Sequence, residues 1–303
     1  MSVGTVAKPP PIPTAAPRQG ALRANLRQAY DLSLMGALGG LFGLYLFVES
    51  ARAESAYARA ALAGLFIGGA LGVFLNAYGP LRDGAWRKLA RAVALGAPAA
   101  AVGGALGVVL GEFVIAAFQG GLLGRAFSWS VLGLGIGLGQ GIADRSRQRL
   151  AFGLIGGGIG GFVGGLLFES MRVALGNRPD LGQALGIVVL GAGLGLCLAL
   201  VEQALRRSWV QVLSGRQEGR IYLLSRASSR IGLDEHAEVG LFGDPLVSRR
   251  HAEVRAGATG YVLHDLAGAG TTRVNGQAVT ETCPIRDGDR IELGRTLLIF
   301  RRR

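Results

Sequence analysis

The chain is poor in the residues that build metal, redox and catalytic sites. It has two cysteines, Cys197 and Cys283. It has three histidines, and all three histidines come after residue 207. Neither cysteine has a CxxC partner, so we expect both thiols to be reduced and structural. Without a histidine in residues 1–207, a Ser–His intramembrane protease or a zinc peptidase there lacks its base or its ligand. With two lysines and no GxxxxGK[ST] run, a P-loop is excluded. We therefore expect no enzyme, no metal and no cofactor.

Charged residues are scarce as well, at 17% of the 303 residues, whereas apolar residues account for 50%. Glycine contributes 51 residues, more than twice its usual share of about 7%. So apolar a chain does not stay disordered in water, and the absence of a glycine repeat of period three excludes collagen. The remaining class is a membrane protein with small-residue helix packing. The net charge of +12 lies mostly in this hydrophobic part, which favours basic loops beside a membrane over a nucleic-acid partner.

Residues 1–28 are Pro-rich and basic and lack the apolar core of a signal peptide, so we expect a flexible cytoplasmic tail. Six apolar runs follow. Five are near the length of about 20 residues that a membrane-spanning helix needs, and the third is longer. The six runs are Leu32–Val48, Ala60–Ala77, Ala92–Phe118, Ala126–Ala143, Leu150–Leu167 and Leu181–Val201. The sequence therefore predicts an all-α six-span membrane domain over residues 29–207. We also expect three helical hairpins in this domain, because residues 131–140 and 189–198 align without gaps.

Arginine and lysine are unevenly divided between the two sides of these spans. One side carries Lys8, Arg18, Arg23, Arg27, Arg82, Arg87, Lys88, Arg91, Arg145, Arg147, Arg149, Arg206 and Arg207. The other side carries only Arg52, Arg59, Arg125, Arg172 and Arg178. Because basic loops stay in the cytoplasm, we expect a multi-pass plasma-membrane protein with both termini cytoplasmic.

Glycine recurs at every fourth position in four of the apolar runs. The series are Gly64/Gly68/Gly72, Gly103/Gly107/Gly111, Gly133/Gly137/Gly141 and Gly153/Gly157/Gly161/Gly165. This spacing is close to one helical turn, so each series forms a flat groove where backbones can approach closely. We interpret the series as glycine zippers that pack helices within the chain. A pore lining or a seam between copies in a homo-oligomer is the alternative.

Three acidic residues, Glu49, Glu112 and Glu169, fall toward the outer ends of their apolar runs. Ionisable residues inside a bilayer are functional candidates by default. We expect headgroups or water to solvate these three, and a cation or proton path is the alternative.

After Arg207 the apolar pattern changes to a two-residue alternation. Short strands are predicted at Trp209–Leu213, Arg220–Leu224, Ser229–Leu233, Ala252–Arg255, Tyr261–Asp265, Thr272–Val274 and Arg290–Phe300. Turn sequences such as GDP, VNG and RDGD stand between them. Short strands with frequent turns are typical of an antiparallel β-sandwich or barrel, which we place at residues 208–303.

This segment resembles a forkhead-associated (FHA) domain. The matching elements are Ile231–Gly232, the run Val247-Ser248-Arg249-Arg250-His251-Ala252, Asp265-Leu266, Val274-Asn275-Gly276, and Gly288-Asp289 through Leu293-Gly294. The resemblance covers residues 208–303 and none of the membrane part. It implies a two-sheet β-sandwich that binds phosphothreonine peptides with loops at one end.

The resemblance also implies roles for single residues. Ser248, Arg249 and Thr271 match phosphopeptide-binding positions, and Gly232, His251, Asn275 and Gly276 match positions that support the binding loops. Two residues depart from the family pattern: Leu233 stands where an arginine usually grips the phosphate, and Gly270 where an asparagine reads the peptide backbone. Arg230 does not replace that arginine, because an odd spacing on a strand turns it to the other face.

The best interpretation is a membrane protein with a cytoplasmic FHA-like module. The module recruits a protein partner that contains phosphothreonine. Binding without phosphate and a purely structural module are alternatives, given Leu233 and Gly270. Two other hypotheses assign the main function to the membrane half: a small transporter or channel regulated by the module, or an oligomeric membrane scaffold.

Overall fold

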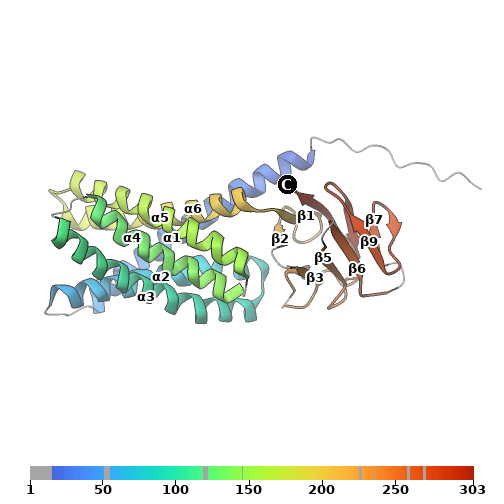
Figure 1. Cartoon of the computed structure of the whole chain (residues 1–303), viewed down its shortest axis with the longest axis horizontal. Helices are drawn as coiled ribbons and strands as arrows, with labels where there is room; N and C mark the ends of the chain where they lie inside the picture. Colours follow the sequence, from blue (N-terminus) through green and yellow to red (C-terminus); the bar gives the residue numbers. More distant parts are fainter. Residues whose placement is uncertain are drawn as a thin grey trace, which may run out of the picture.

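The computed structural model describes residues 16–50, 55–118, 122–144, 146–224, 227–235, 237–257, 260–268 and 271–303. Six long helices come first and a β-sandwich follows, so the predicted all-α then all-β architecture is confirmed. The sandwich lies beyond one end of the helical domain (Figure 1). Each helix holds a stretch of 21 to 28 residues that is long and apolar enough to cross a membrane.

The helices are α1 (Ala16–Ser50), α2 (Ala56–Asp83), α3 (Trp86–Phe118), α4 (Leu122–Asp144), α5 (Arg147–Ala174) and α6 (Pro179–Leu205). Helix α1 begins within the segment expected to be a flexible tail. The run from Ala21 to Gln28 is rich in alanine, leucine, arginine and glutamine, which favour helix. Residues 1–15 of that segment lie outside the described residues.

The six helices form a closed ring. Each helix packs against the next one along the chain, and α1 also packs against α6. The interior of the ring is apolar, and its fully buried side chains include Leu71, Leu132, Ile136, Leu190 and Leu194. Many large apolar side chains on the outside are exposed, which suits a surface that faces lipid.

Glycine pairs hold neighbouring helices at backbone contact. The pairs are Gly36 with Gly191, Gly64 with Gly104, Gly133 with Gly157, and Gly137 with Gly153. A Cβ atom added to any of these residues would lie closer than 3.0 Å to the backbone of the opposing glycine. The periodic glycines therefore serve contacts between helices of the same chain, which allow extensive dispersion contact between the backbones.

The three acidic residues of the spans differ in their surroundings. Glu49 and Glu112 are exposed, whereas Glu169 is only 2% exposed. The carboxylate of Glu169 accepts hydrogen bonds from Arg172 Nε at 2.8 Å and from Arg125 Nη1 at 3.4 Å. The expectation that all three are solvated is therefore wrong for Glu169, because two arginines neutralise it inside the helical domain.

The sandwich has two sheets. One has the strand order β2-β1-β11-β10-β7-β8 and the other β4-β3-β5-β6-β9. The strands are β1 (Ser208–Ser214), β2 (Ile221–Leu223), β3 (Ser228–Gly232), β4 (Val239–Gly240), β5 (Ala252–Ala256), β6 (Tyr261–Asp265), β7 (Thr272–Val274), β8 (Gln277–Ala278), β9 (Thr282–Ile285), β10 (Arg290–Leu293) and β11 (Thr296–Arg302). Fully buried Ile231, Leu263, Ile291 and Phe300 lie in the core between the sheets. The expected strands at Tyr261–Asp265 and Thr272–Val274 are confirmed with the same ends, and those that correspond to β1, β2, β3 and β5 with shifted ends. The short strands β4, β8 and β9 were not expected.

The segment Arg290–Phe300 is not one strand, as the sequence suggested, but a hairpin. Strands β10 and β11 pair antiparallel, with Leu293 opposite Thr296. Gly294 turns the chain between them with a φ of +59°, in the left-handed region that favours glycine. The two-residue turn Gly294-Arg295 gave a weaker sequence signal than Asn275-Gly276, because only the latter is a strong hairpin dipeptide.

Candidate functional site

The loops that hold the family-matched residues are joined through their backbones. The N–H of Leu233, just after β3, donates to the carbonyl of Ser248 at 3.1 Å. The N–H of Asp234 donates to the carbonyl of Arg249 at 3.0 Å. A Cβ atom on Gly232 would clash with both of these carbonyl groups. Glycine at position 232 is therefore what allows the loop before β5 to lie flat against the end of β3.

His251 connects this loop to two more segments from a fully buried position. The imidazole Nδ1 of His251 accepts the backbone N–H of Ser248 at 3.0 Å. The backbone N–H of His251 donates to the carbonyl of Ile231 at 3.0 Å. Its carbonyl accepts the N–H groups of Leu266 and Ala267. Burial lowers the pKa of His251, which keeps the imidazole neutral, and only an unprotonated Nδ1 can accept the Ser248 hydrogen bond.

Ser248 and Arg249 are presented to solvent on the loop that His251 supports. Both side chains are exposed, and neither makes a hydrogen bond or an ion pair with any residue in the described ranges. A hydroxyl and a guanidinium that are both unengaged can donate to an oxyanion. Thr271 is also exposed, and its Oγ1 donates to the carbonyl of Gly268 at 3.1 Å. Gly270 lies outside the described residues.

Leu233 does not extend into solvent as Ser248 does. Its side chain is partly buried and packs against the hydrophobic core of the sandwich. Arg230 lies on β3 beside a cavity next to the helices. Neither residue therefore places a second guanidinium next to Ser248.

The Asn275-Gly276 pair forms the turn between β7 and β8. The φ angles are +52° for Asn275 and +82° for Gly276, as a two-residue hairpin of this kind requires. The Asn275 side chain accepts the N–H of Arg290 and donates to Asp289, both at 2.9 Å. This residue holds the hairpin against the start of β10 and has a supporting role.

Asp244 is a supporting residue that the sequence analysis missed. Its carboxylate accepts the N–H of Leu246 at 3.1 Å, the N–H of Arg295 at 2.7 Å and the hydroxyl of Thr296 at 2.9 Å. The segment that leads into Ser248 is therefore anchored to the β10–β11 turn by Asp244. Burial alone would raise the pKa of Asp244, but the three hydrogen bonds outweigh it and lower the pKa. The sequence signal was the Asp-Pro pair, which indicated only a turn.

Comparison with known proteins finds similarity in the C-terminal part of the chain. Residues 211–303 match a family model described as the inner membrane component of T3SS, cytoplasmic domain. The C-terminal segment of the chain is an FHA domain. None of the curated proteins compared with the chain matches it.

Several solved structures are similar to this segment of the chain. A structure from work on phosphothreonine-dependent FHA domain interactions is 35% identical over 32% of this chain and 97% of its own, with a TM-score of 0.29. The FhaA FHA domain, crystallised with the intracellular domain of Rv3910, is 36% identical over 31% of this chain and 99% of its own, with a TM-score of 0.28. The cytoplasmic domain of the T3SS sorting platform protein PscD from P. aeruginosa is 20% identical over 32% of this chain and 80% of its own, with a TM-score of 0.29.

The FHA domain also contacts the helical domain. Glu235, in the loop after β3, accepts the backbone N–H of Arg87 at 3.2 Å, and Lys88 donates to the carbonyl of Ala237. At the end of the chain, Arg303 Nη1 donates to the carbonyl of Ala204 at 2.7 Å. The FHA domain is therefore attached to the helices by more than the α6–β1 connection, and the loop after β3 lies beside the α2–α3 turn.

Proposed function

We propose that this protein is a multi-pass membrane protein that uses its FHA domain to recruit a threonine-phosphorylated protein to the cytoplasmic face. The observation that carries the proposal is the exposed, unengaged pair Ser248 and Arg249 on a loop fixed by His251. A phosphate group carries a charge of about −1.5 to −2 and strong acceptor oxygens, which suit a hydroxyl and a guanidinium. The FHA domain structure solved in work on phosphothreonine-dependent interactions supports this chemistry.

The site is a weak version of such a pocket. With Leu233 packed on the core, one charged hydrogen-bonding group is missing, which costs about 1.5–3 kcal/mol of binding free energy. A partner held at the same membrane surface meets the site at a high effective concentration, so moderate affinity is sufficient for recruitment. The proposal also includes the topology: the FHA domain and the N-terminus lie in the cytoplasm, as the distribution of arginine predicts.

The test uses the full chain in nanodiscs and a library of threonine-phosphorylated peptides with their unphosphorylated counterparts. We expect a subset of phosphopeptides to bind, and the double variant Ser248→Ala/Arg249→Gln to lose that binding. Arg255→Gln is the matched control, because Arg255 is exposed on β5 and pairs with Glu253 away from the loops. Equal binding of phosphorylated and unphosphorylated peptides would refute a phosphate-dependent site and favour recruitment that needs no phosphate.

A further inference from the structure

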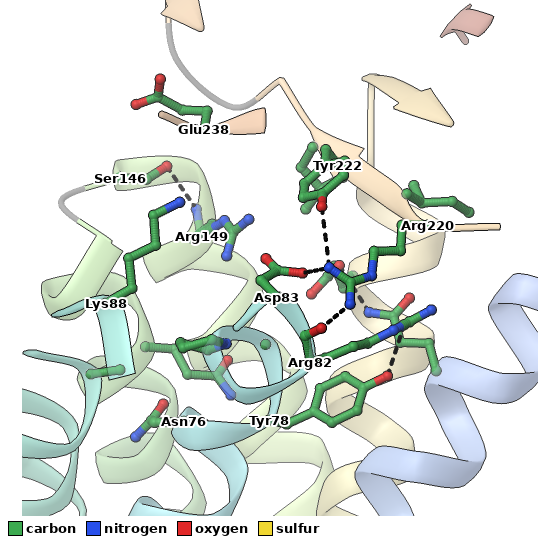
Figure 2. A pocket seen from close by; sticks show the side chains of 18 of the residues that line it. Asn76, Tyr78, Arg82, Asp83, Lys88, Ser146, Arg149, Arg220, Tyr222 and Glu238 are labelled. Atoms are coloured by element: carbon green, nitrogen blue, oxygen red, sulfur yellow. Dashed lines mark hydrogen bonds and ion pairs between the residues drawn. The ribbon is translucent and has the colours of Figure 1, made fainter. Parts of the chain in front are cut away.

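A cavity of about 430 Å³ lies between the FHA domain and the helix ends that face it (Figure 2). Its size is within the range of about 300–1,000 Å³ that is usual for ligand pockets. The helices contribute apolar side chains, among them Leu75, Phe152 and Leu198. Charged side chains come from both domains, with Arg220 and Arg230 on the FHA side. The cavity is therefore apolar on the helix side and charged where the two domains meet.

Basic residues outnumber acidic ones around the cavity. The basic lining residues are Arg82, Arg87, Lys88, Arg91, Arg149, Arg220 and Arg230, and the acidic ones are Asp83, Glu202, Glu235 and Glu238. Because each acidic group attracts a cation, the number of arginines alone does not define an anion site. What decides the matter is which of these groups already have partners inside the protein.

All four carboxylates have protein partners. Asp83 pairs with Arg220 at 2.8 Å, and Glu202 accepts the side-chain amide of Gln28 at 3.0 Å. Glu235 and Glu238 accept backbone N–H groups, at 3.2 Å and 2.9 Å respectively. By contrast, the guanidinium groups of Arg87, Arg91 and Arg230 make no hydrogen bond or ion pair with any described residue. These three guanidinium groups therefore carry positive charge that no described residue of the protein pairs with.

A buried amide gives an independent indication of a ligand. Asn76 lies on α2, is only 6% exposed and lines the cavity. Neither its Nδ2 nor its Oδ1 has a hydrogen-bond partner among the described residues. Gly96 on α3 makes the space for this side chain, because a Cβ atom there would clash with the Asn76 amide. A buried amide without a partner destabilises the folded chain, and a ligand with polar groups would supply the missing hydrogen bonds.

We propose that this cavity binds a phosphate-bearing ligand that bridges the helical domain and the FHA domain. Arg91 on α3 and Arg230 on β3 hold the phosphate from the two domains, since guanidinium groups match phosphate oxygens in geometry and charge. Asn76 contacts a polar group at the helix side of the cavity, and the neighbouring leucine and phenylalanine side chains contact an apolar part. Two sources carry this chemistry: an anionic phospholipid at the membrane surface, and a soluble phosphate compound.

The test measures the thermal unfolding midpoint of the full chain in detergent. One arm compares phosphatidylglycerol with phosphatidylcholine of the same acyl chains, and the other compares pyrophosphate with sodium chloride at equal ionic strength. For a saturating ligand we expect the wild type to gain about 5 °C or more. The variants Asn76→Leu and Arg91→Gln/Arg230→Gln should lose at least half of that gain. Arg178→Gln, at the opposite end of the helices, should keep it.

A gain with phosphatidylglycerol alone supports a lipid ligand, and a gain with pyrophosphate alone supports a soluble one. The double arginine variant keeps the test decisive if Asn76→Leu does not fold, because Arg91 and Arg230 are both partly solvent-exposed. The proposal is overturned if neither compound raises the wild-type midpoint above its control. It is also overturned if the full gain persists in Arg91→Gln/Arg230→Gln.

Discussion

Asp83, the last residue of α2, forms an ion pair with Arg220, which precedes β2 in the FHA domain, with Oδ1 and Nη1 2.8 Å apart. Arg220 also donates to the carbonyl of Arg82 and lies within 3.5 Å of the Tyr222 hydroxyl. Both members of the pair are mostly buried, with side-chain exposures of 23% and 18%. The contact joins residues 137 positions apart and is one of the contacts that tie the FHA domain to the helices.

Arg220→Gln should release the FHA domain from the helix ends. Removing one partner leaves Asp83 partly buried without its charge-assisted hydrogen bond, so the docked arrangement should lose about 1.5–3 kcal/mol. Hydrogen exchange of the full chain in nanodiscs should show faster exchange in residues 219–223 and 86–89. Arg255→Gln removes an exposed ion pair with Glu253 inside the FHA domain and should leave these amides unchanged. Unchanged exchange in Arg220→Gln would mean that the other contacts are sufficient for docking.

The helix packing should be sensitive to single methyl groups at the glycine pairs. Gly157→Ala places a Cβ atom against the backbone of Gly133 and should destabilise the chain by about 1–3 kcal/mol. Gly69→Ala is the matched control, because its Cβ atom would make an ordinary contact of 3.4 Å with Ala101. The control should be neutral or slightly stabilising, since alanine favours helix over glycine. Thermal unfolding in detergent compares the two, and equal midpoints would contradict close packing at Gly157.

The sequence predicted those parts of the FHA domain that carry short, recognisable motifs. Gly232, His251 and the Asn275-Gly276 turn belong to short motifs that can be read from the sequence, although their contacts reach other segments of the domain. The membrane spans were predictable for a similar reason, because length and hydropathy are local properties.

The rest depends on residues that are distant in the chain. Asp244 reaches Arg295 and Thr296, and the Asp83–Arg220 pair spans two domains. The burial of Glu169 needs Arg125 from another helix. Nothing in the local pattern around these residues distinguishes them from exposed charges, so only the tertiary arrangement identifies them.

The proposed topology predicts which engineered cysteines an impermeant reagent reaches in intact cells. In a chain whose two native cysteines are replaced by alanine, Asn177→Cys should be labelled from outside, because residue 177 lies in the exposed α5–α6 connection. Glu218→Cys, in the exposed turn between β1 and β2, should be labelled only after permeabilisation. Labelling of Glu218→Cys in intact cells would place the FHA domain outside and reverse the topology.

Asp244 should make the stability of the FHA domain depend on pH in the acidic range. Its pKa is lower in the folded than in the unfolded chain, so its contribution is fully present above the unfolded value of about 3.9. That contribution is lost as the pH falls through the folded pKa. Asp244→Asn should destabilise the domain at pH 7 by about 1–3 kcal/mol and reduce the loss of stability between pH 5 and pH 3. Glu218→Gln, an exposed control, should change neither quantity.

Leu233→Arg should strengthen phosphopeptide binding while weakening the fold. The new guanidinium would add a charge-assisted hydrogen bond beside Ser248, because the backbone of residue 233 is already tied to the Ser248 carbonyl. We expect several-fold tighter binding of a phosphothreonine peptide in a calorimetric titration of the full chain. Loss of the leucine from the edge of the core should lower the unfolding midpoint at the same time. Leu233→Gln separates the two effects, since it removes the same apolar contact without adding a charge. If Leu233→Arg binds no more tightly than Leu233→Gln, the phosphate does not sit between residues 233 and 248, and the recruitment site lies elsewhere on the domain.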